Sequence, residues 1–179
     1  MRYLLRRPVG RHLYFVRAAV LQVCLVLLLV SPAQAQPESS EFDALFMRAS
    51  FRWLPDTDWR WLKAQCYQES RFDPRAVSPV GARGLCQFMP GTWGEARAAL
   101  GVRNTFSARE NAWAAGWYMR RMKAIWHTPR PDLERLRLAQ ASYNAGAGHI
   151  IRAQAACGGA RDWRDIRECL PEITGRHSE

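Results

Sequence analysis

The sequence predicts an all-α fold, or nearly so, and three observations lead to that prediction. Apolar residues recur at three- and four-residue spacing over most of the chain after residue 42. Proline and glycine fall where such helical stretches should end. No segment shows the strict apolar/polar alternation or the hairpin turn of a strand pair, and no internal repeat is present. A fold built from packed helices follows from these patterns.

Helices are expected in a definite order. The first five cover about residues 42–53, 58–73, 92–100, 108–126 and 132–143. A short helix follows Gly148 and ends near residue 156, and a last one covers about 163–170. Ser107 and Glu110 form a capping box at the start of the longest helix. Residues 75–84, rich in glycine and proline, are expected to form a loop.

Residues 1–35 have the layout of a secretory signal peptide. Five arginines precede an apolar run from Ala18 to Val30, and Ser31–Ala35 carries an A-x-A cleavage pattern. An uncleaved membrane anchor is the alternative, but the run has 13 residues, short of the ~20 that span a bilayer. We therefore expect cleavage after Ala35. The mature chain would have a polar leader over 36–41, one folded domain over 42–171 and a polar tail over 172–179.

The charge of the chain indicates an anionic partner. The formal net charge of +10 falls to +5 without residues 1–35, because that segment holds five arginines and no acidic residue. A basic domain favours nucleic acid or an anionic cell-wall polymer. Export favours the wall polymer, and the basic residues are scattered rather than gathered into a nucleic-acid motif. We expect a protein of the periplasm or cell envelope that does not bind nucleic acid.

Four cysteines remain after cleavage, and an even number in an exported domain suggests two disulfides. They are Cys66, Cys86, Cys157 and Cys169. Their spacing matches no C-x-x-C metal pair and the histidines are not spaced with them, so no metal site is expected. Three pairings are open, and four free buried thiols are a further alternative.

Glu69 places a carboxylate on the helix face that should be buried. Leu62 and Cys66 precede it by seven and three residues, and on an ideal helix both project within roughly 80° of it. A structural Glu would be exposed, or paired with Arg71 or Arg75. A catalytic Glu would have a pKa raised by apolar neighbours and would hold a proton near neutral pH. Glycoside cleavage needs such an acid, because the leaving oxygen is protonated as the bond breaks.

Further polar and aromatic residues are candidates for sugar binding. Ser78 and Gln87 lie in and after the glycine-rich loop, and Tyr143 and Asn144 lie where a helix ends at glycine. An aromatic face can hold a sugar ring, and amides can bind hydroxyl and acetamide groups. Each residue also has a simpler explanation, as a turn cap, a backbone partner, a core aromatic and a helix terminator respectively.

The order of these residues is more specific than any one of them. The segment QESRFDPRAVSPVGARGLCQFMPGTW, Gln68–Trp93, closely resembles the catalytic segment of the soluble lytic transglycosylase family, which is related to goose-type lysozyme. The segment ASYNAGAGHI, Ala141–Ile150, resembles the second signature of that family. The resemblance extends over about residues 49–152, most of the mature chain.

The resemblance implies a lysozyme-like α fold that cleaves peptidoglycan between N-acetylmuramic acid and N-acetylglucosamine. It implies that Glu69 is the catalytic acid and base. The positions that align with the sugar-binding residues of the family are Ser78, Gln87, Met89, Tyr143 and Asn144. No cofactor is implied, and the partner is the glycan strand of peptidoglycan.

Two cysteines depart from the family pattern. Cys86 replaces the usual Met, and Cys66 stands where an aliphatic residue is usual. Together they suggest a disulfide between Cys66 and Cys86, beside the catalytic helix. The other pair would be Cys157 and Cys169, which closes a local loop of 12 residues.

A second carboxylate, which glycosidases ordinarily use, is hard to find. Asp73 precedes Pro74 and suits a turn, while Asp56 and Asp58 open the helix of Glu69, over ~15 Å away. The resemblance implies that one carboxylate suffices. Glu69 protonates the leaving oxygen, and the substrate's acetamide stabilises the anomeric carbon. Glu69 then deprotonates the muramic acid's own primary hydroxyl, which attacks to give a 1,6-anhydro sugar.

Two other functions compete with this expectation. A hydrolytic lysozyme would use water as the nucleophile, and a wall-binding module would have a dead site. The intact Glu69 and Gln87, with the Tyr143-Asn144 pair, argue against the dead site. The biological role stays open among wall remodelling, phage lysis and the opening of the wall for a secretion or conjugation apparatus. We expect the chain to be a monomer.

Overall fold

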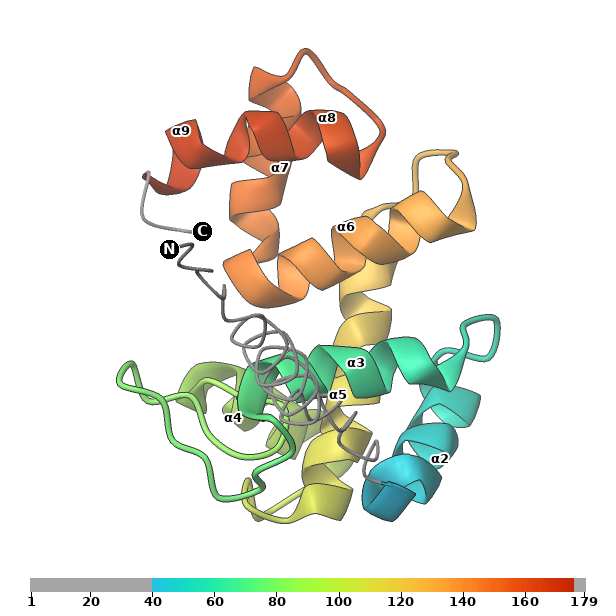
Figure 1. Ribbon diagram of the computed structural model, residues 1–179, viewed down its shortest axis with the longest axis vertical. Helices are drawn as coiled ribbons and strands as arrows, with labels where there is room; N and C mark the ends of the chain where they lie inside the picture. The colour runs from blue at the N-terminus through green and yellow to red at the C-terminus, as the bar shows by residue number, and fades with distance from the viewer. Residues whose placement is uncertain (1–39, 176–179) are drawn as a thin grey trace, which may run out of the picture. The chain divides into compact units, whose positions relative to one another are not determined.

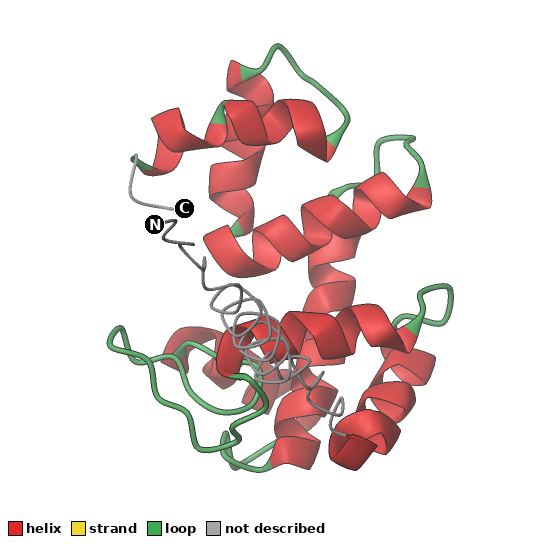
Figure 2. Ribbon diagram, viewed as in Figure 1, coloured by secondary structure: helices red, strands yellow, loops and turns green. Residues whose placement is uncertain are grey.

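A computed structural model describes residues 40–175, in which every regular element is helical, as the sequence predicts (Figure 1, Figure 2). The expected signal peptide, residues 36–39 of the expected leader and residues 176–179 of the expected tail lie outside the described residues, whereas residues 172–174 of that tail are helical. The elements are the 3₁₀ turn η1 (Ser40–Phe42) and the helices α2 (Asp43–Trp53), α3 (Trp59–Ser70), α4 (Pro90–Leu100), α5 (Ala108–Ile125), α6 (Asp132–Ala145), α7 (Ala147–Ala156), α8 (Trp163–Glu168) and α9 (Leu170–Thr174). None of these helices is long and apolar enough to cross a membrane.

Helix α5 lies at the centre of the fold, because α2, α3, α4 and α6 all pack against it. Figure 1 shows it passing behind α3 towards α6. Ser107 begins the helix, and its Oγ accepts the Glu110 N–H at 3.4 Å. The predicted capping box is only half formed. The Glu110 carboxylate accepts instead from the backbone N–H groups of Arg103 and Asn104, at 2.5 and 2.9 Å, and so ties the preceding loop to α5.

Small residues let α2 and α5 approach closely. A Cβ added at Gly116 would lie 3.0 Å from Trp53 Cδ1 and 3.2 Å from the Ala49 Cβ, so no larger residue fits there without a shift. Around this contact lies the main core, formed by α2, α3, α4, α5 and the loop before α4. Its largest fully buried members are Phe46, Leu62, Leu85 and Met119.

A second, smaller core holds the C-terminal helices together. It consists of Trp126, Leu138, Ile150, Ala153 and Ile166. The Trp126 indole N–H donates to Ser142 Oγ at 3.1 Å inside this core. The bond satisfies both buried polar groups and fixes the last turns of α6 against the end of α5.

Most helix boundaries lie within about two residues of the predicted ones, but α3 ends at Ser70, three residues before the predicted end. The last predicted helix, 163–170, is two helices, α8 and α9, with Cys169 between them. Pro171 lies in the first turn of α9. Proline has no N–H to continue the hydrogen-bond pattern of α8, so the helix ends and a new one begins.

Candidate active site

Glu69 is the next-to-last residue of α3. Asp58 begins this helix, with Oδ1 accepting the Arg60 N–H at 2.9 Å, and Arg71 ends it in the left-handed conformation at φ 55°. The α3 face that carries Glu69 also carries Leu62 and Cys66, which are 1% and 0% exposed. Glu69 itself is half-buried, so the helix carries its carboxyl at the edge of the core, as the spacing predicts.

The Glu69 carboxylate is bound by an amide rather than by a cation. Gln65, one turn earlier on α3, donates from Nε2 to Glu69 Oε1 at 2.7 Å. Among residues 40–175, Glu69 makes no ion pair, and the Arg71 guanidinium lies over the Tyr67 ring instead, 4.6 Å from its centroid. Burial raises the pKa of Glu69, and the Gln65 hydrogen bond opposes this increase. The structural alternative of an arginine-paired Glu is therefore wrong.

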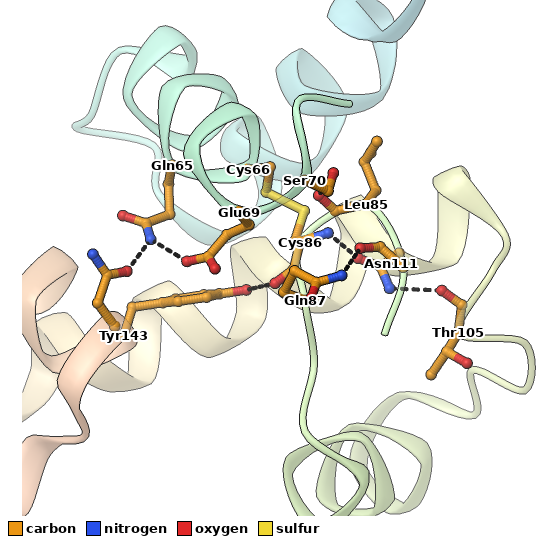
Figure 3. Close-up of a disulfide and its surroundings, with 12 residues drawn as sticks. Gln65, Cys66, Glu69, Ser70, Leu85, Cys86, Gln87, Thr105, Asn111 and Tyr143 are labelled. Atoms are coloured by element: carbon orange, nitrogen blue, oxygen red, sulfur yellow. Dashed lines mark hydrogen bonds between the residues drawn. A yellow bond between two sulfur atoms is a disulfide. The ribbon is translucent and has the colours of Figure 1, made fainter. Parts of the chain in front are cut away.

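Tyr143 reaches the site from α6. Its hydroxyl donates to the Cys86 carbonyl at 3.0 Å (Figure 3). Its ring packs edge-on against Tyr118, with centroids 5.0 Å apart. Burial, and then the charge of Glu69, raise the pKa of Tyr143 well above its usual value. The phenol therefore stays neutral over the range in which Glu69 titrates.

The segment between α3 and α4, residues 71–89 and here called the site loop, is held at its middle by Asn111. This fully buried side chain accepts the Cys86 N–H at 2.8 Å and donates to the Thr105 carbonyl at 2.7 Å. Gly84 packs against Asn111 and Thr105. A Cβ at this position would collide with the Thr105 carbonyl and with Asn111 Nδ2. Together with a φ of +79°, this close approach requires glycine.

Two of the predicted sugar-binding residues in the site loop, Ser78 and Gln87, form hydrogen bonds with the backbone. Ser78 Oγ accepts the Ala82 N–H at 3.0 Å. Gln87, at φ 49°, donates from Nε2 to the carbonyls of Gly84 and Ala76, at 3.0 and 3.3 Å. Neither side chain bonds Glu69. Met89, just before α4, is 44% exposed.

Cys86, the residue before Gln87, is bonded to α3, α5 and α6. Cys66 and Cys86 form a disulfide, the pairing that the sequence suggests, with Cα atoms 4.4 Å apart and both side chains fully buried. Next to this disulfide, Ser70 Oγ donates to the Leu85 carbonyl at 2.7 Å. Figure 3 shows how the disulfide and these hydrogen bonds fasten the site loop to α3, α5 and α6 around Glu69.

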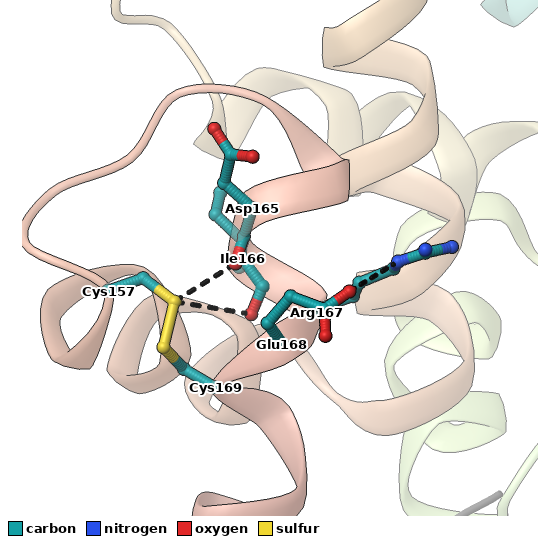
Figure 4. A network of polar contacts seen from close by, with 6 residues as sticks. All are labelled: Cys157, Asp165, Ile166, Arg167, Glu168 and Cys169. Atoms are coloured by element: carbon teal, nitrogen blue, oxygen red, sulfur yellow. Dashed lines mark hydrogen bonds and ion pairs between the residues drawn. A yellow bond between two sulfur atoms is a disulfide. The ribbon is translucent and has the colours of Figure 1, made fainter.

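Cys157 and Cys169 form the second disulfide, which lies away from Glu69 and joins the end of α7 to the junction of α8 and α9 (Figure 4). Its Cα atoms are 5.9 Å apart. Cys157 Sγ lies 3.0 Å from the Asp165 carbonyl. A disulfide sulfur carries no hydrogen, so this is a packing contact rather than a hydrogen bond.

None of the three aspartates considered as a second carboxylate has an evident catalytic position. Asp73 is exposed and accepts the Arg75 N–H at 2.8 Å, as a turn residue does. Asp58 caps the opposite end of α3 and pairs with Arg60 at 3.0 Å. Asp56 is exposed before the same helix end.

Two functional candidates were missed from the sequence. Gln65, 5% exposed, bonds both Glu69 and, from the same nitrogen, the side chain of Asn144 on α6. Asn111 organises the site loop. The spacing of Gln65 to Glu69 is i to i+4, which places both on one helix face and could have drawn attention to the pair. Nothing local distinguishes Asn111 from an ordinary helix residue.

The chain belongs to the transglycosylase SLT domain family, whose model matches residues 52–166. It is 33% identical over 138 residues to membrane-bound lytic murein transglycosylase F of Salmonella arizonae, covering 75% of this chain and 25% of that protein. It is 36% identical over 125 residues to the protein of the same name from Shewanella woodyi, covering 68% of this chain and 25% of that protein.

A solved structure shares the fold. The crystal structure of the 70 kDa soluble lytic transglycosylase from Escherichia coli superposes with a TM-score of 0.61 at 25% identity, covering 75% of this chain and 22% of that one. The lysozyme-like α fold implied by the sequence is thereby confirmed. The chain spans about a quarter of the length of the curated relatives it matches.

Proposed function

We propose that this chain is an exported lytic transglycosylase that cleaves the N-acetylmuramic acid to N-acetylglucosamine linkage of peptidoglycan without water. Membership of the transglycosylase SLT domain family supports the reaction class. The single observation that carries the proposal is the half-buried Glu69 carboxyl. Its pKa is raised by burial, and no cation among the described residues pairs with it. Such a carboxyl can hold a proton near neutral pH and donate it.

One carboxyl can serve both halves of the reaction. In the first half, Glu69 gives its proton to the glycosidic oxygen, and the electron pair of the broken bond goes to that oxygen. The substrate's acetamide oxygen stabilises the positive anomeric carbon. In the second half, the Glu69 carboxylate takes the proton of the muramic acid's primary hydroxyl. That oxygen bonds to the anomeric carbon, which forms the 1,6-anhydro sugar and restores protonated Glu69.

The remaining predicted residues would bind the glycan directly or hold the site that binds it. Asn144 is exposed at the end of α6 and can donate to an acetamide or hydroxyl group. Met89 offers an exposed apolar contact beside Gln87. Tyr143 would hold the Cys86 peptide in place and present its ring edge. Ser78 would shape the turn of the site loop. These assignments rest on the family resemblance, together with the positions of the residues around Glu69.

The periplasm or cell envelope is the proposed location. The signal-peptide layout of residues 1–35 and two disulfides, which persist in oxidising compartments, support export. The glycan strand of peptidoglycan is the proposed partner, and the positive charge of the mature chain suits an anionic polymer.

The products released from purified peptidoglycan test the proposal. Mass spectrometry of muropeptides should find 1,6-anhydro ends. Reducing ends would show a hydrolytic lysozyme, and no release would show a binding module; either result would overturn the proposal.

Glu69→Gln keeps the shape and the hydrogen bond to Gln65 but cannot transfer the proton. Release should fall by about 10²–10⁴-fold, and a wild-type rate would remove Glu69 from the mechanism.

A further inference from the structure

Gln65 connects the acid on α3 to the predicted sugar-binding residue on α6. Its side-chain nitrogen donates to Glu69 Oε1 at 2.7 Å (Figure 3). The same nitrogen also donates to Asn144 Oδ1. A primary amide has two N–H donors, so both are used. Gln65 is 5% exposed, and an amide buried without partners would cost stability. The two hydrogen bonds account for a polar residue at this position.

The hydrogen-bonding chemistry of Glu69, Gln65 and Asn144 fixes the orientation of both amides. An ionised carboxylate can only accept hydrogen bonds, so Gln65 has to turn its nitrogen towards Glu69. The same nitrogen bonds Asn144, which therefore turns its oxygen towards α3 and its own amino group away from α3. If Asn144 alone flipped, its amino group would face the amino group of Gln65, which pairs two donors. If Gln65 alone flipped, its oxygen would face Glu69 Oε1 and Asn144 Oδ1, which pairs acceptors with acceptors. The Asn144 bond thus keeps the Gln65 nitrogen on Glu69.

We propose that Gln65 is a positioning residue. It keeps Glu69 Oε1 as a hydrogen-bond acceptor throughout the reaction, so that the transferable proton sits on Oε2. It also holds Asn144 in the orientation that presents its amino group to the glycan. The inference rests on the proposed function, because it assigns a role to the same carboxyl.

The electrostatic surroundings make this bond influential. Burial raises the pKa of Glu69, and the Gln65 hydrogen bond is the opposing influence. From α6 the titratable neighbour is Tyr143, which stays neutral. In the site loop, Arg71 lies on the Tyr67 ring and Asp73 bonds a backbone N–H, and both are exposed. With no described charge opposing burial, Gln65 stabilises the ionised form that must act as the base in the second step.

The matched substitutions are Gln65→Met and Gln68→Met. Met is close to Gln in length but cannot donate, and Gln68 is exposed on the same helix. Carboxyl carbon NMR of glutamate-labelled protein follows the titration of Glu69, which Glu69→Gln identifies by loss of its signal. In Gln65→Met we expect a higher Glu69 pKa than in wild type. Muropeptide release should fall about tenfold, the usual effect of losing a hydrogen bond to a charged group. The pH midpoint of release should move upward with the pKa.

A second variant and a double substitution separate positioning from stability. Gln65→Glu keeps the length but adds a like charge beside Glu69, so the Glu69 pKa should rise further. Asn144→Ala combined with Gln65→Met should slow release by less than the product of the single effects, because the two residues share one network. Gln68→Met should match wild type in every measurement.

The inference is wrong if Gln65→Met lowers thermal stability but leaves the Glu69 pKa and the pH midpoint equal to those of Gln68→Met. Fully multiplicative effects of Gln65→Met and Asn144→Ala would also overturn the link to α6. If the wild-type protein releases no muropeptides, the proposed function fails. The NMR titration of Glu69 still decides the part played by Gln65, because it needs no substrate.

Discussion

The Glu69 carboxyl makes the stability of the fold depend on pH. Its pKa is raised by burial in the folded chain, whereas in the unfolded chain it lies near ~4.3. A raised folded pKa means that the folded state holds the proton more tightly. The contribution to stability is therefore fully present below the unfolded pKa and is lost as the pH rises through the folded value.

Glu69→Gln should accordingly stabilise the protein at neutral pH. Gln keeps the shape and the acceptor oxygen for Gln65 but carries no charge to bury. Thermal unfolding should occur at a higher temperature than in wild type at pH 7–8, and the difference should shrink near pH 4. An equal difference at both pH values would show that burial of the charge is not its cause.

Activity should follow the protonation of the same group. Because the first step needs protonated Glu69, release of muropeptides by wild type should fall as the pH rises through the raised pKa of Glu69. Rates measured across the pH range on one peptidoglycan preparation would show this decrease. The residual release by Glu69→Gln should not decrease in this way. A decrease that persists in this variant would assign the titration to another residue.

At the scale of elements, the site loop is a firmly bonded part of the candidate active site. Its middle is bonded to three helices: Leu85 to α3 through Ser70, Cys86 to α3 through the disulfide and to α5 through Asn111, and Cys86 again to α6 through Tyr143. A loop so connected gives Gln87 and Met89 fixed positions without substrate, which reduces the entropy lost on binding.

Gly84 and Gly94 offer a matched pair of substitutions that tests this bonding. Gly84→Ala would set a Cβ against Thr105 and Asn111 at a φ of +79°, and should cost on the order of 3 kcal/mol of unfolding free energy and most of the activity. Gly94→Ala, inside α4 with open space around it, should stabilise by up to about 1 kcal/mol. Chemical denaturation and muropeptide release measure both, and equal effects of the two would contradict the role given to Gly84.

At the scale of the whole molecule, the two disulfides serve different cores. Replacing Cys157 and Cys169 by Ala should lower stability by about 2–4 kcal/mol but leave the rate of a still-folded protein near wild type. Replacing Cys66 and Cys86 should cost a similar amount and also slow release, because the site loop loses its link to α3. Denaturation and activity of the two double variants at one temperature separate these effects. Equal loss of activity in both would refute the distinction.

Export is the remaining expectation for the whole chain. Protein from the cell envelope should begin at Gln36, because residues 1–35 carry the cleavage pattern. Amino-terminal sequencing determines the first residue directly. Recovery of an intact Met1 terminus in the membrane fraction would instead indicate an uncleaved anchor.

Local periodicity and composition were sufficient to predict much of the structure of this protein. The helices follow from apolar spacing and from proline and glycine at their ends. The half-buried position of Glu69 follows from its spacing to Leu62 and Cys66 along one helix. These features could be predicted because each depends on residues a few positions apart, whose relative directions the helix geometry dictates. The split of the last helix at Cys169 was missed, although Pro171 was the local cause.

The tertiary structure decided which residues meet around that carboxyl. Gln65 bonds Asn144 across 79 residues, Tyr143 bonds Cys86 across 57, and Asn111 bonds Cys86 across 25. No local pattern encodes such contacts, because they depend on how α3, α5 and α6 pack around two cores. The sequence by itself determined the helical fold and the half-buried position of the Glu69 carboxyl. Packing alone determined which buried amides hold that carboxyl and the site loop, because a buried polar group takes whichever partner the fold brings within hydrogen-bonding distance.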